Sequence, residues 1–171
     1  MKEKTYSKSC WGNDLETTRE VGDETVCPKC NKEGKKVKSI TVKHLVNHEL
    51  ENEINDEQYN LCMNEKCDVI YYNSNTTYEK DYVKVPIWFK NDADPKYICY
   101  CNKVTEKQIV DAVINKNAKD MKDIIRITGA MKNGKCLINN PTGECCGTTI
   151  QETINKALEK KLLWNKNEKY C

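Results

Sequence analysis

Five cysteines in the second half of the chain have the type and spacing of a metal-cluster site. Cys99 and Cys101 form a C-x-C pair, and after a gap of 34 residues come Cys136 and the adjacent Cys145 and Cys146. Thiolates are the usual ligands of iron-sulfur clusters, and four of them complete a 2Fe-2S centre. We therefore interpret four of these five cysteines as the ligands of an iron-sulfur site.

Both parts of this group are followed by sequences typical of a helix start. Thr105 with Gln108, and Thr148 with Gln151, have capping-box spacing, in which threonine precedes glutamine by three residues. Two helix N-termini would then converge on the cysteines. Four thiolates and two sulfides around two ferric ions sum to a charge of about −2, which the partial positive charge of a helix N-terminus stabilises.

A second cysteine group lies in the first half of the chain. Cys27 and Cys30 form a C-x2-C turn, and Cys62 and Cys67 form a C-x4-C pair. Both spacings fall in the range of tetrahedral zinc sites made of four cysteines. We predict that these thiolates hold zinc in a structural role, because a closed four-cysteine site leaves no position for a substrate.

The composition favours a soluble metal protein over a secreted disulfide scaffold. Eleven cysteines is an odd number, the opening residues are polar, and no apolar run is long enough to span a membrane. The 28 basic and 26 acidic side chains are mixed along the sequence, so no strong field favours nucleic acid. We expect a cytoplasmic protein with neither a nucleic-acid nor a membrane partner.

The chain is expected to fold as two small domains. Its 171 residues are only 38% hydrophobic, and cores this small usually need metals or disulfides to stabilise them. A polar, turn-rich stretch over residues 91–95 sets the boundary. We predict an α+β fold, with a flexible leader over 1–25, a zinc-binding module over 26–92, a cluster domain over 93–164 and a tail over 165–171.

The zinc-binding module is predicted to mix short strands with one short helix. Apolar residues over 40–46 indicate a strand leading into a helix capped by Thr41, and residues 69–72 indicate a buried strand. Aromatic and branched residues over 78–88 predict one or two further strands. His44 and His48 would share a helical face and could bind zinc or copper, although such pairs are commonly surface residues.

The cluster domain is predicted to contain three helices around one modest core. Apolar spacing indicates one helix from Glu106 to Ile114 and another from Met121, with Asp120 as its cap and Gly129 as its stop. A third helix is expected from about Thr149. Residues 136–146 would form a long loop between the second and third helices.

Two separate motifs in the same order resemble one known family. The run ICYCNKVTE from Ile98, followed by CLINNPTGECC from Cys136, resembles the N-terminal half of the archaeal-type copper chaperone CopZ. The block with CPKC, Glu33, Gly34 and the later C-x4-C pair is similar to the zinc region of that family. The similarity covers about residues 25–160.

The cluster half is also similar to bacterioferritin-associated ferredoxin, abbreviated BFD, whose domain binds a 2Fe-2S cluster. The resemblance implies that Cys99, Cys101, Cys136 and one of Cys145 and Cys146 hold the cluster, and that the four cysteines of the first half hold zinc. Alignment with the family favours Cys146, with Cys145 as its substitute. The implied fold is a zinc-binding α+β module followed by a three-helix BFD-like domain.

The resemblance implies a redox protein of one-electron transfer, with reduction of Cu(II) to Cu(I) as a further activity. Its partners would be a redox or copper-handling protein and copper ion. The Met-x-Cys-x-x-Cys copper loop of the full chaperone does not occur after residue 146, so we expect the copper-binding domain to be missing.

Two other functions stay open from the residues alone. One is a zinc-stapled interaction module without a cluster, and the other is an iron-sulfur storage or transfer protein. No nucleophile and base stand out in the sequence, so an electron carrier or metal-handling protein is favoured over an enzyme.

Overall fold

The computed structural model describes residues 25–168, with side-chain environments through Trp164. Most of the expected leader, including Cys10, lies outside the described residues, as does Cys171. Within the described part of the chain, two α+β halves lie side by side, each with its own buried core. The prediction of a mixed α+β fold is confirmed.

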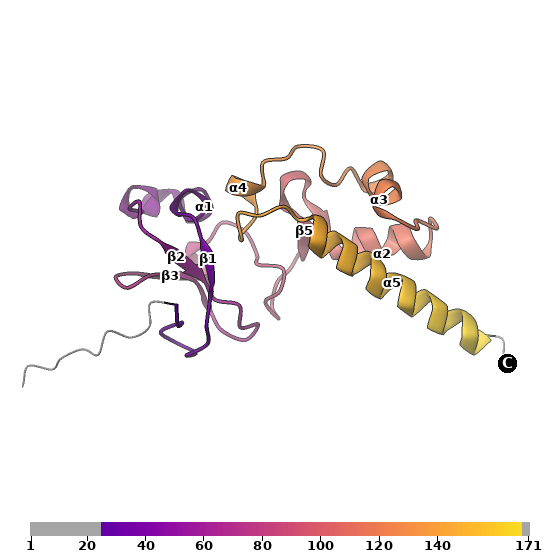
Figure 1. Ribbon diagram of the computed structural model, residues 1–171, viewed down its shortest axis with the longest axis horizontal. Helices are drawn as coiled ribbons and strands as arrows, with labels where there is room; N and C mark the ends of the chain where they lie inside the picture. Colours follow the sequence, from indigo (N-terminus) through magenta and orange to yellow (C-terminus); the bar gives the residue numbers. More distant parts are fainter. Residues whose placement is uncertain (1–24, 169–171) are drawn as a thin grey trace, which may run out of the picture.

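The first half is built on a four-stranded antiparallel sheet in the order β1-β2-β3-β4 (Figure 1). All four residues of β3 are buried, as expected for a run of branched and aromatic side chains between two neighbouring strands. The strand β2 was not predicted, because three residues carry too little periodicity. The strands are β1 (Lys35–Val37), β2 (Tyr59–Leu61), β3 (Val69–Tyr72) and β4 (Thr77–Glu79).

The short helix α1 (Ser39–Leu45) begins earlier than predicted. Lys38 occupies the N-cap position, and Thr41, the predicted cap, lies fully buried inside the helix. The Thr41 hydroxyl donates a hydrogen bond of 2.7 Å to the carbonyl of Leu137, which is 96 residues away. The prediction of a threonine cap was wrong because Thr41 serves a long-range contact instead.

The predicted strands over residues 78–88 form only in part. Tyr78 lies in β4, but the chain then turns into the 3-10 helix η2 (Lys80–Tyr82). Val83 makes a single bridge to Val46, and the chain continues without a strand to residue 96. Residues that were predicted as strand therefore fill the core beneath α1 and the 3-10 helix η1 (His48–Glu53) as irregular backbone.

The second half packs three helices around a core that includes two cysteines, Cys99 and Cys146. A 3-10 turn joins β5 to β6, β6 runs directly into α2, and α5 lies along α2 (Figure 1). Its elements are β5 (Tyr97–Cys99), η3 (Tyr100–Asn102), β6 (Val104–Thr105), α2 (Glu106–Ile114), α3 (Met121–Thr128), α4 (Cys136–Asn139) and α5 (Gly147–Glu168).

The local helix signals were partly correct. The capping box of Thr105 and Gln108 is present, with Gln108 N–H donating 3.2 Å to the Thr105 hydroxyl. Asp120 caps α3 as predicted, and Gly129 ends it with a φ of 77°. The second capping box was wrong, because α5 begins at Gly147 and Thr148 already lies inside its first turn.

The segment 136–146 is more ordered than the predicted loop. Its first residues form the one-turn helix α4, which packs against α1 of the first half (Figure 1). Three contacts fix the segment to the first half: Thr41 to Leu137, Tyr71 to Pro141 and Lys35 to Glu144. The two halves therefore meet along the segment that lies between two of the predicted cluster cysteines.

Candidate metal centres

The four cysteines of the first half lie close enough to share one metal ion. Their sulfurs all lie within 4.8 Å of one another, with 3.9 Å between Cys27 and Cys67 and 3.6 Å between Cys30 and Cys62. Zn–S bonds of about 2.3 Å in a tetrahedron give sulfur separations of about 3.8 Å. The residues therefore fit a closed zinc site, and we propose these four cysteines as its ligands.

Hydrogen bonds favour the ionised form of one cysteine at this site, whereas burial opposes the ionisation of two others. Burial opposes ionisation of Cys30, but bonds from Asn64 and from the Lys32 backbone outweigh it and lower the pKa of this thiol to about 6. Burial raises the pKa of Cys62 and of Cys67. A cation overcomes that penalty, because zinc binds thiolates and displaces their protons.

A buried lysine supports the turn that carries the second cysteine pair. Lys90 is only 4% exposed, and its ammonium group donates four hydrogen bonds of 2.9–3.0 Å to backbone carbonyls. Burial lowers the pKa of Lys90, while the nearby sulfurs of Cys62 and Cys67 oppose that shift. Its acceptors are the carbonyls of Cys62, Asn64, Cys67 and Val69.

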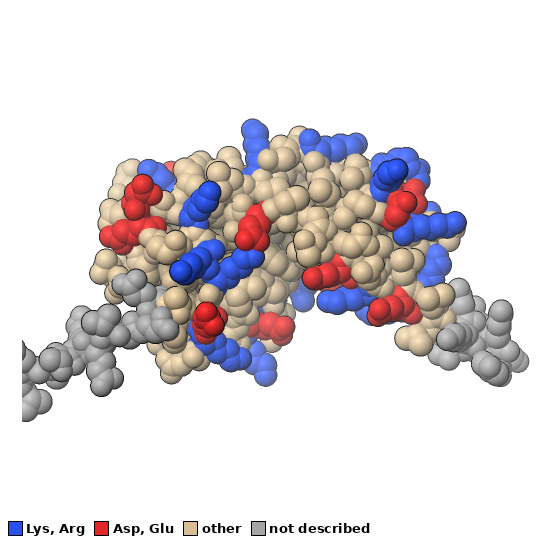
Figure 2. All heavy atoms as spheres, viewed as in Figure 1, with Lys and Arg blue, Asp and Glu red and all other residues tan. Residues whose placement is uncertain are grey.

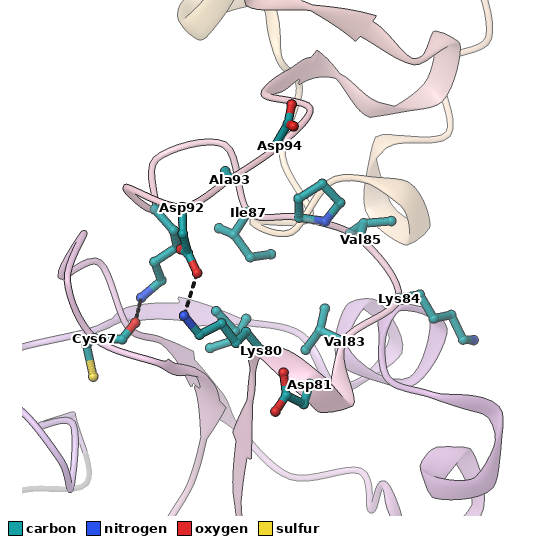
Figure 3. Close-up of a pocket in the computed structure, with 13 residues that line it drawn as sticks. Cys67, Lys80, Asp81, Val83, Lys84, Val85, Ile87, Asp92, Ala93 and Asp94 are labelled. Atoms are coloured by element: carbon teal, nitrogen blue, oxygen red, sulfur yellow. Dashed lines mark hydrogen bonds and ion pairs between the residues drawn. The ribbon is translucent and has the colours of Figure 1, made fainter.

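A cavity of about 280 Å³ lies beside Cys67 and holds side chains that already pair with one another (Figure 3). Lys80 forms ion pairs of 2.5 Å with Asp92 and 2.8 Å with Asp68. Lys84, on the opposite rim, pairs with Glu51 at 2.6 Å. The ammonium groups of Lys80 and Lys84 are thus held by carboxylates, and that of Lys90, which also lines the cavity, is held by backbone carbonyls.

The two histidines do not form the predicted pair. His44 lies near the end of α1, and its ring Nδ1 is 2.9 Å from the carbonyl of Ile40. His48 begins η1, after the α-helix has ended, and lies 2.7 Å from Glu51. Because the two residues belong to different elements, they share no helical face. Among described residues, the cysteine group of the first half includes neither of them.

The cysteines of the second half form two pairs of unequal exposure. Cys99 and Cys146 are buried at 0% and 2% exposure, and their thiols are hydrogen bonded. Cys101 and Cys136 are partly exposed, with 3.7 Å between their sulfurs. That distance is close to the separation expected for two sulfurs on one tetrahedral metal. These four residues would hold a cluster with two buried and two partly exposed ligand sulfurs.

Backbone donors surround the buried sulfur of Cys99. The hydrogen bond from Cys146 is the largest influence lowering the pKa of Cys99 to about 6, and backbone N–H groups of Met131, Asn102 and Cys101 act in the same direction. The Met131 N–H lies 3.4 Å from this sulfur. The shared bond and burial raise the pKa of Cys146 in return. Donors of this kind stabilise negative charge on sulfur and tune the potential of a cluster.

The adjacent residues Cys145 and Cys146 differ in burial. Cys146 is buried beside Cys99, and its carbonyl accepts the first hydrogen bond of α5 from Ile150 at 2.9 Å. Cys145 is exposed. Helix α5, one of the two helices expected to start at the cluster, thus begins directly after Cys146, a candidate ligand. We propose Cys99, Cys101, Cys136 and Cys146 as the cluster ligands, with Cys145 outside the set.

Tyr100, between Cys99 and Cys101, holds the C-x-C pair in place. Its hydroxyl donates to the Pro86 carbonyl at 2.7 Å and accepts from the Trp88 N–H at 3.0 Å. These bonds were not predicted from the sequence. Sequence reasoning also missed Lys90, Thr41 and Tyr71, which carry no local signal because their partners lie far away in the sequence.

Comparison with known proteins agrees with both sites. Residues 24–84 match the zinc binding domain family of CopZ, and residues 97–160 match the BFD-like 2Fe-2S binding domain family. The copper chaperone CopZ of Archaeoglobus fulgidus is 38% identical over 120 residues, which are 70% of this chain and 57% of that protein. The X-ray structure of its N-terminal domain matches with a TM-score of 0.63 and 36% identity, over 74% of this chain and 95% of that one.

The fold and the two sites define a protein in which a zinc-binding module is joined to a BFD-like 2Fe-2S domain. Its cofactors are zinc and a 2Fe-2S cluster. The chain belongs to the CopZ family and corresponds to the N-terminal region of that copper chaperone. It spans 57% of the length of the curated relative.

Proposed function

We propose that this chain is a one-electron carrier in metal handling. When bound, a 2Fe-2S cluster accepts or releases one electron at a time. The observation that supports the proposal is the difference in exposure between the Cys101–Cys136 pair and the Cys99–Cys146 pair. The partly exposed sulfurs provide an edge for electron exchange, and the buried sulfurs keep the other side from water.

The zinc-binding module has a structural role in this proposal. Its four cysteines form a closed set around one position, and zinc has no redox chemistry. The reactive centre is therefore the second cysteine group, while the first fixes the fold around it. Cysteines that must stay reduced in both sites suit the cytoplasm, which we propose as the working compartment.

The partner proposed for the exposed edge is an acidic redox protein. Segments 96–104 and 129–147, which hold the cluster cysteines, contain four lysines and one carboxylate. Lys103, Lys132 and Lys135 are exposed, whereas Glu144 pairs with Lys35 at 2.5 Å. Elsewhere on the face in Figure 2, basic and acidic side chains are interspersed. A local excess of lysines attracts anionic surfaces at low salt.

Reduction of Cu(II) to Cu(I) is the second candidate, and the similarity to a copper chaperone favours it. Each reduced chain would give one electron to one cupric ion, and soft sulfur ligands then prefer the cuprous product. The lysines around the edge repel free cupric ion, so copper would reach this edge on a protein or in an anionic complex.

A redox titration under anaerobic conditions tests the proposed function. We expect each chain to take up one electron from dithionite and return it to an oxidant over repeated cycles, without loss of iron. When cupric ion is the oxidant, a chelator specific for Cu(I) should trap one Cu(I) for each reduced chain. A storage or transfer protein would instead lose its cluster to an acceptor apo-protein, and that result would overturn the proposal of an electron carrier.

A further inference from the structure

The segment between Cys136 and Cys146 rests on the zinc-binding module rather than on its own domain alone. The Thr41 hydroxyl donates to the Leu137 carbonyl at 2.7 Å, one residue after Cys136. The Tyr71 hydroxyl, which is buried, donates to the Pro141 carbonyl at 2.8 Å, midway between the two cysteines. Both donors come from the first half of the chain, and both acceptors lie between candidate cluster ligands.

The fit between the two halves leaves little space for rearrangement. Gly143, at a φ of 70°, faces Thr41 so closely that a Cβ atom there would lie 2.6 Å from the Thr41 hydroxyl. Lys35 of β1 adds the ion pair with Glu144. Thr41 is therefore enclosed between the segment and the core of the first half, where it is fully buried.

The donor Tyr71 connects this contact to the zinc site. It lies in β3 between Ile70, whose carbonyl accepts the Cys62 N–H at 2.8 Å, and Tyr72, which packs with Cys27, Cys62 and Cys67. The Tyr72 hydroxyl donates to the Thr25 carbonyl at 2.6 Å, next to the first cysteine pair. Strand β3 thus contacts the zinc cysteines through Ile70 and Tyr72, and the cluster segment through Tyr71 between them.

We infer that Thr41 and Tyr71 are positioning residues for the cluster, and that zinc and the cluster stabilise each other through strand β3. Zinc fixes β3, which fixes the segment from Cys136 to Cys146 and so keeps two cluster ligands in register. Linkage requires a reverse effect of the same size on binding free energy, so the cluster must also tighten the binding of zinc. The inference rests on the proposed cluster ligands and goes beyond the proposed electron transfer.

The forward test uses the full chain with both metals bound. The double variant Thr41→Val with Tyr71→Phe removes both hydroxyls, and Tyr78→Phe is the matched control. Tyr78 is buried at 5% exposure, and its hydroxyl has no hydrogen-bond partner among the described residues. We expect the double variant to keep its zinc but to lose iron to a chelator about thirtyfold faster than the wild type, since two lost bonds of about 1 kcal/mol each total about 2 kcal/mol.

The reverse test measures zinc affinity by equilibrium competition with a colorimetric chelator. The variant Cys136→Ser with Cys146→Ser, which holds no cluster, should bind zinc about thirtyfold more weakly than the wild type. In the Thr41→Val, Tyr71→Phe background, the same cysteine changes should have little further effect.

Equal iron loss from the double variant and the wild type would overturn the inference, as would a zinc affinity that is independent of the cluster. Equal acceleration by Tyr78→Phe would show general loosening and would also overturn it. These readouts do not depend on electron transfer. A failed redox titration would remove the proposed function without affecting this coupling.

Discussion

The Lys90 ammonium donates a hydrogen bond of 2.9 Å to the carbonyl of Cys67, a proposed zinc ligand (Figure 3 shows Cys67 at the edge of the cavity). Three further carbonyls accept from the same nitrogen. One buried cation therefore closes the turn that carries Cys62 and Cys67. Charge-assisted bonds of this kind are stronger than neutral ones.

Replacing Lys90 by Met should destabilise the zinc-binding module by about 3 kcal/mol, because four buried carbonyls lose a charged donor. Denaturant unfolding of the zinc-loaded chain measures the loss. Lys80→Met is the control, since the ion pairs of Lys80 join exposed side chains and contribute little to stability. Equal effects of the two changes would show that the buried carbonyls do not depend on Lys90.

Serine substitution should separate the adjacent cysteines. Cys146→Ser is expected to yield a chain with little or no 2Fe-2S cluster, because the buried partner of Cys99 is lost. Cys145→Ser should leave iron content and visible absorption unchanged, because Cys145 is exposed. Iron and sulfide analysis after anaerobic purification decides the outcome, and the opposite pattern would assign the ligand to Cys145.

Reversing the charge of the lysines near the exposed edge should slow electron exchange with anions. We expect Lys132→Glu with Lys135→Glu to reduce the rate of oxidation by hexacyanoferrate(III) severalfold at low salt, with the difference vanishing as salt rises. Stopped-flow absorbance measures the rate. Lys156→Glu with Lys160→Glu, on exposed positions of α5, changes the net charge equally and should have a smaller effect. Identical rates for the two pairs would contradict a local docking edge.

The two threonines that looked alike in the sequence should respond differently. Thr105→Ala removes a formed capping box and should destabilise the cluster domain by about 1 kcal/mol. Thr148→Ala should change stability by less than half as much, because Thr148 is an exposed residue inside α5. Thermal unfolding followed by circular dichroism compares them, and equal losses would indicate that α5 also depends on its predicted cap.

The parts of the structure that were predictable from the sequence are those with local causes. The C-x2-C and C-x4-C spacings predicted a group of four sulfurs, and Asp120 and Gly129 marked the two ends of α3. Buried strand β3 followed from its branched and aromatic residues. In each case the residues that form the feature are adjacent or have a recognised spacing.

The features that were missed depend on partners far apart in the sequence. Thr41 has the residue type of a helix cap, yet its hydroxyl bonds to Leu137, and no pattern near Thr41 indicates that partner. Lys90 looks like a surface lysine until its four acceptors are brought together by folding. Thr148 and Gln151 have capping-box spacing, but the helix starts earlier because Cys146 provides its first acceptor.

The central claim is that each chain carries one zinc ion and one 2Fe-2S cluster that transfers one electron. Metal analysis of anaerobically purified protein, followed by electron paramagnetic resonance after reduction with dithionite, tests it most directly. We predict one zinc, two irons and two sulfides per chain, with no signal when oxidised and one unpaired spin per chain when reduced. A colourless protein with two zinc ions and no iron, or a bound cluster that stays silent after reduction, would contradict the account.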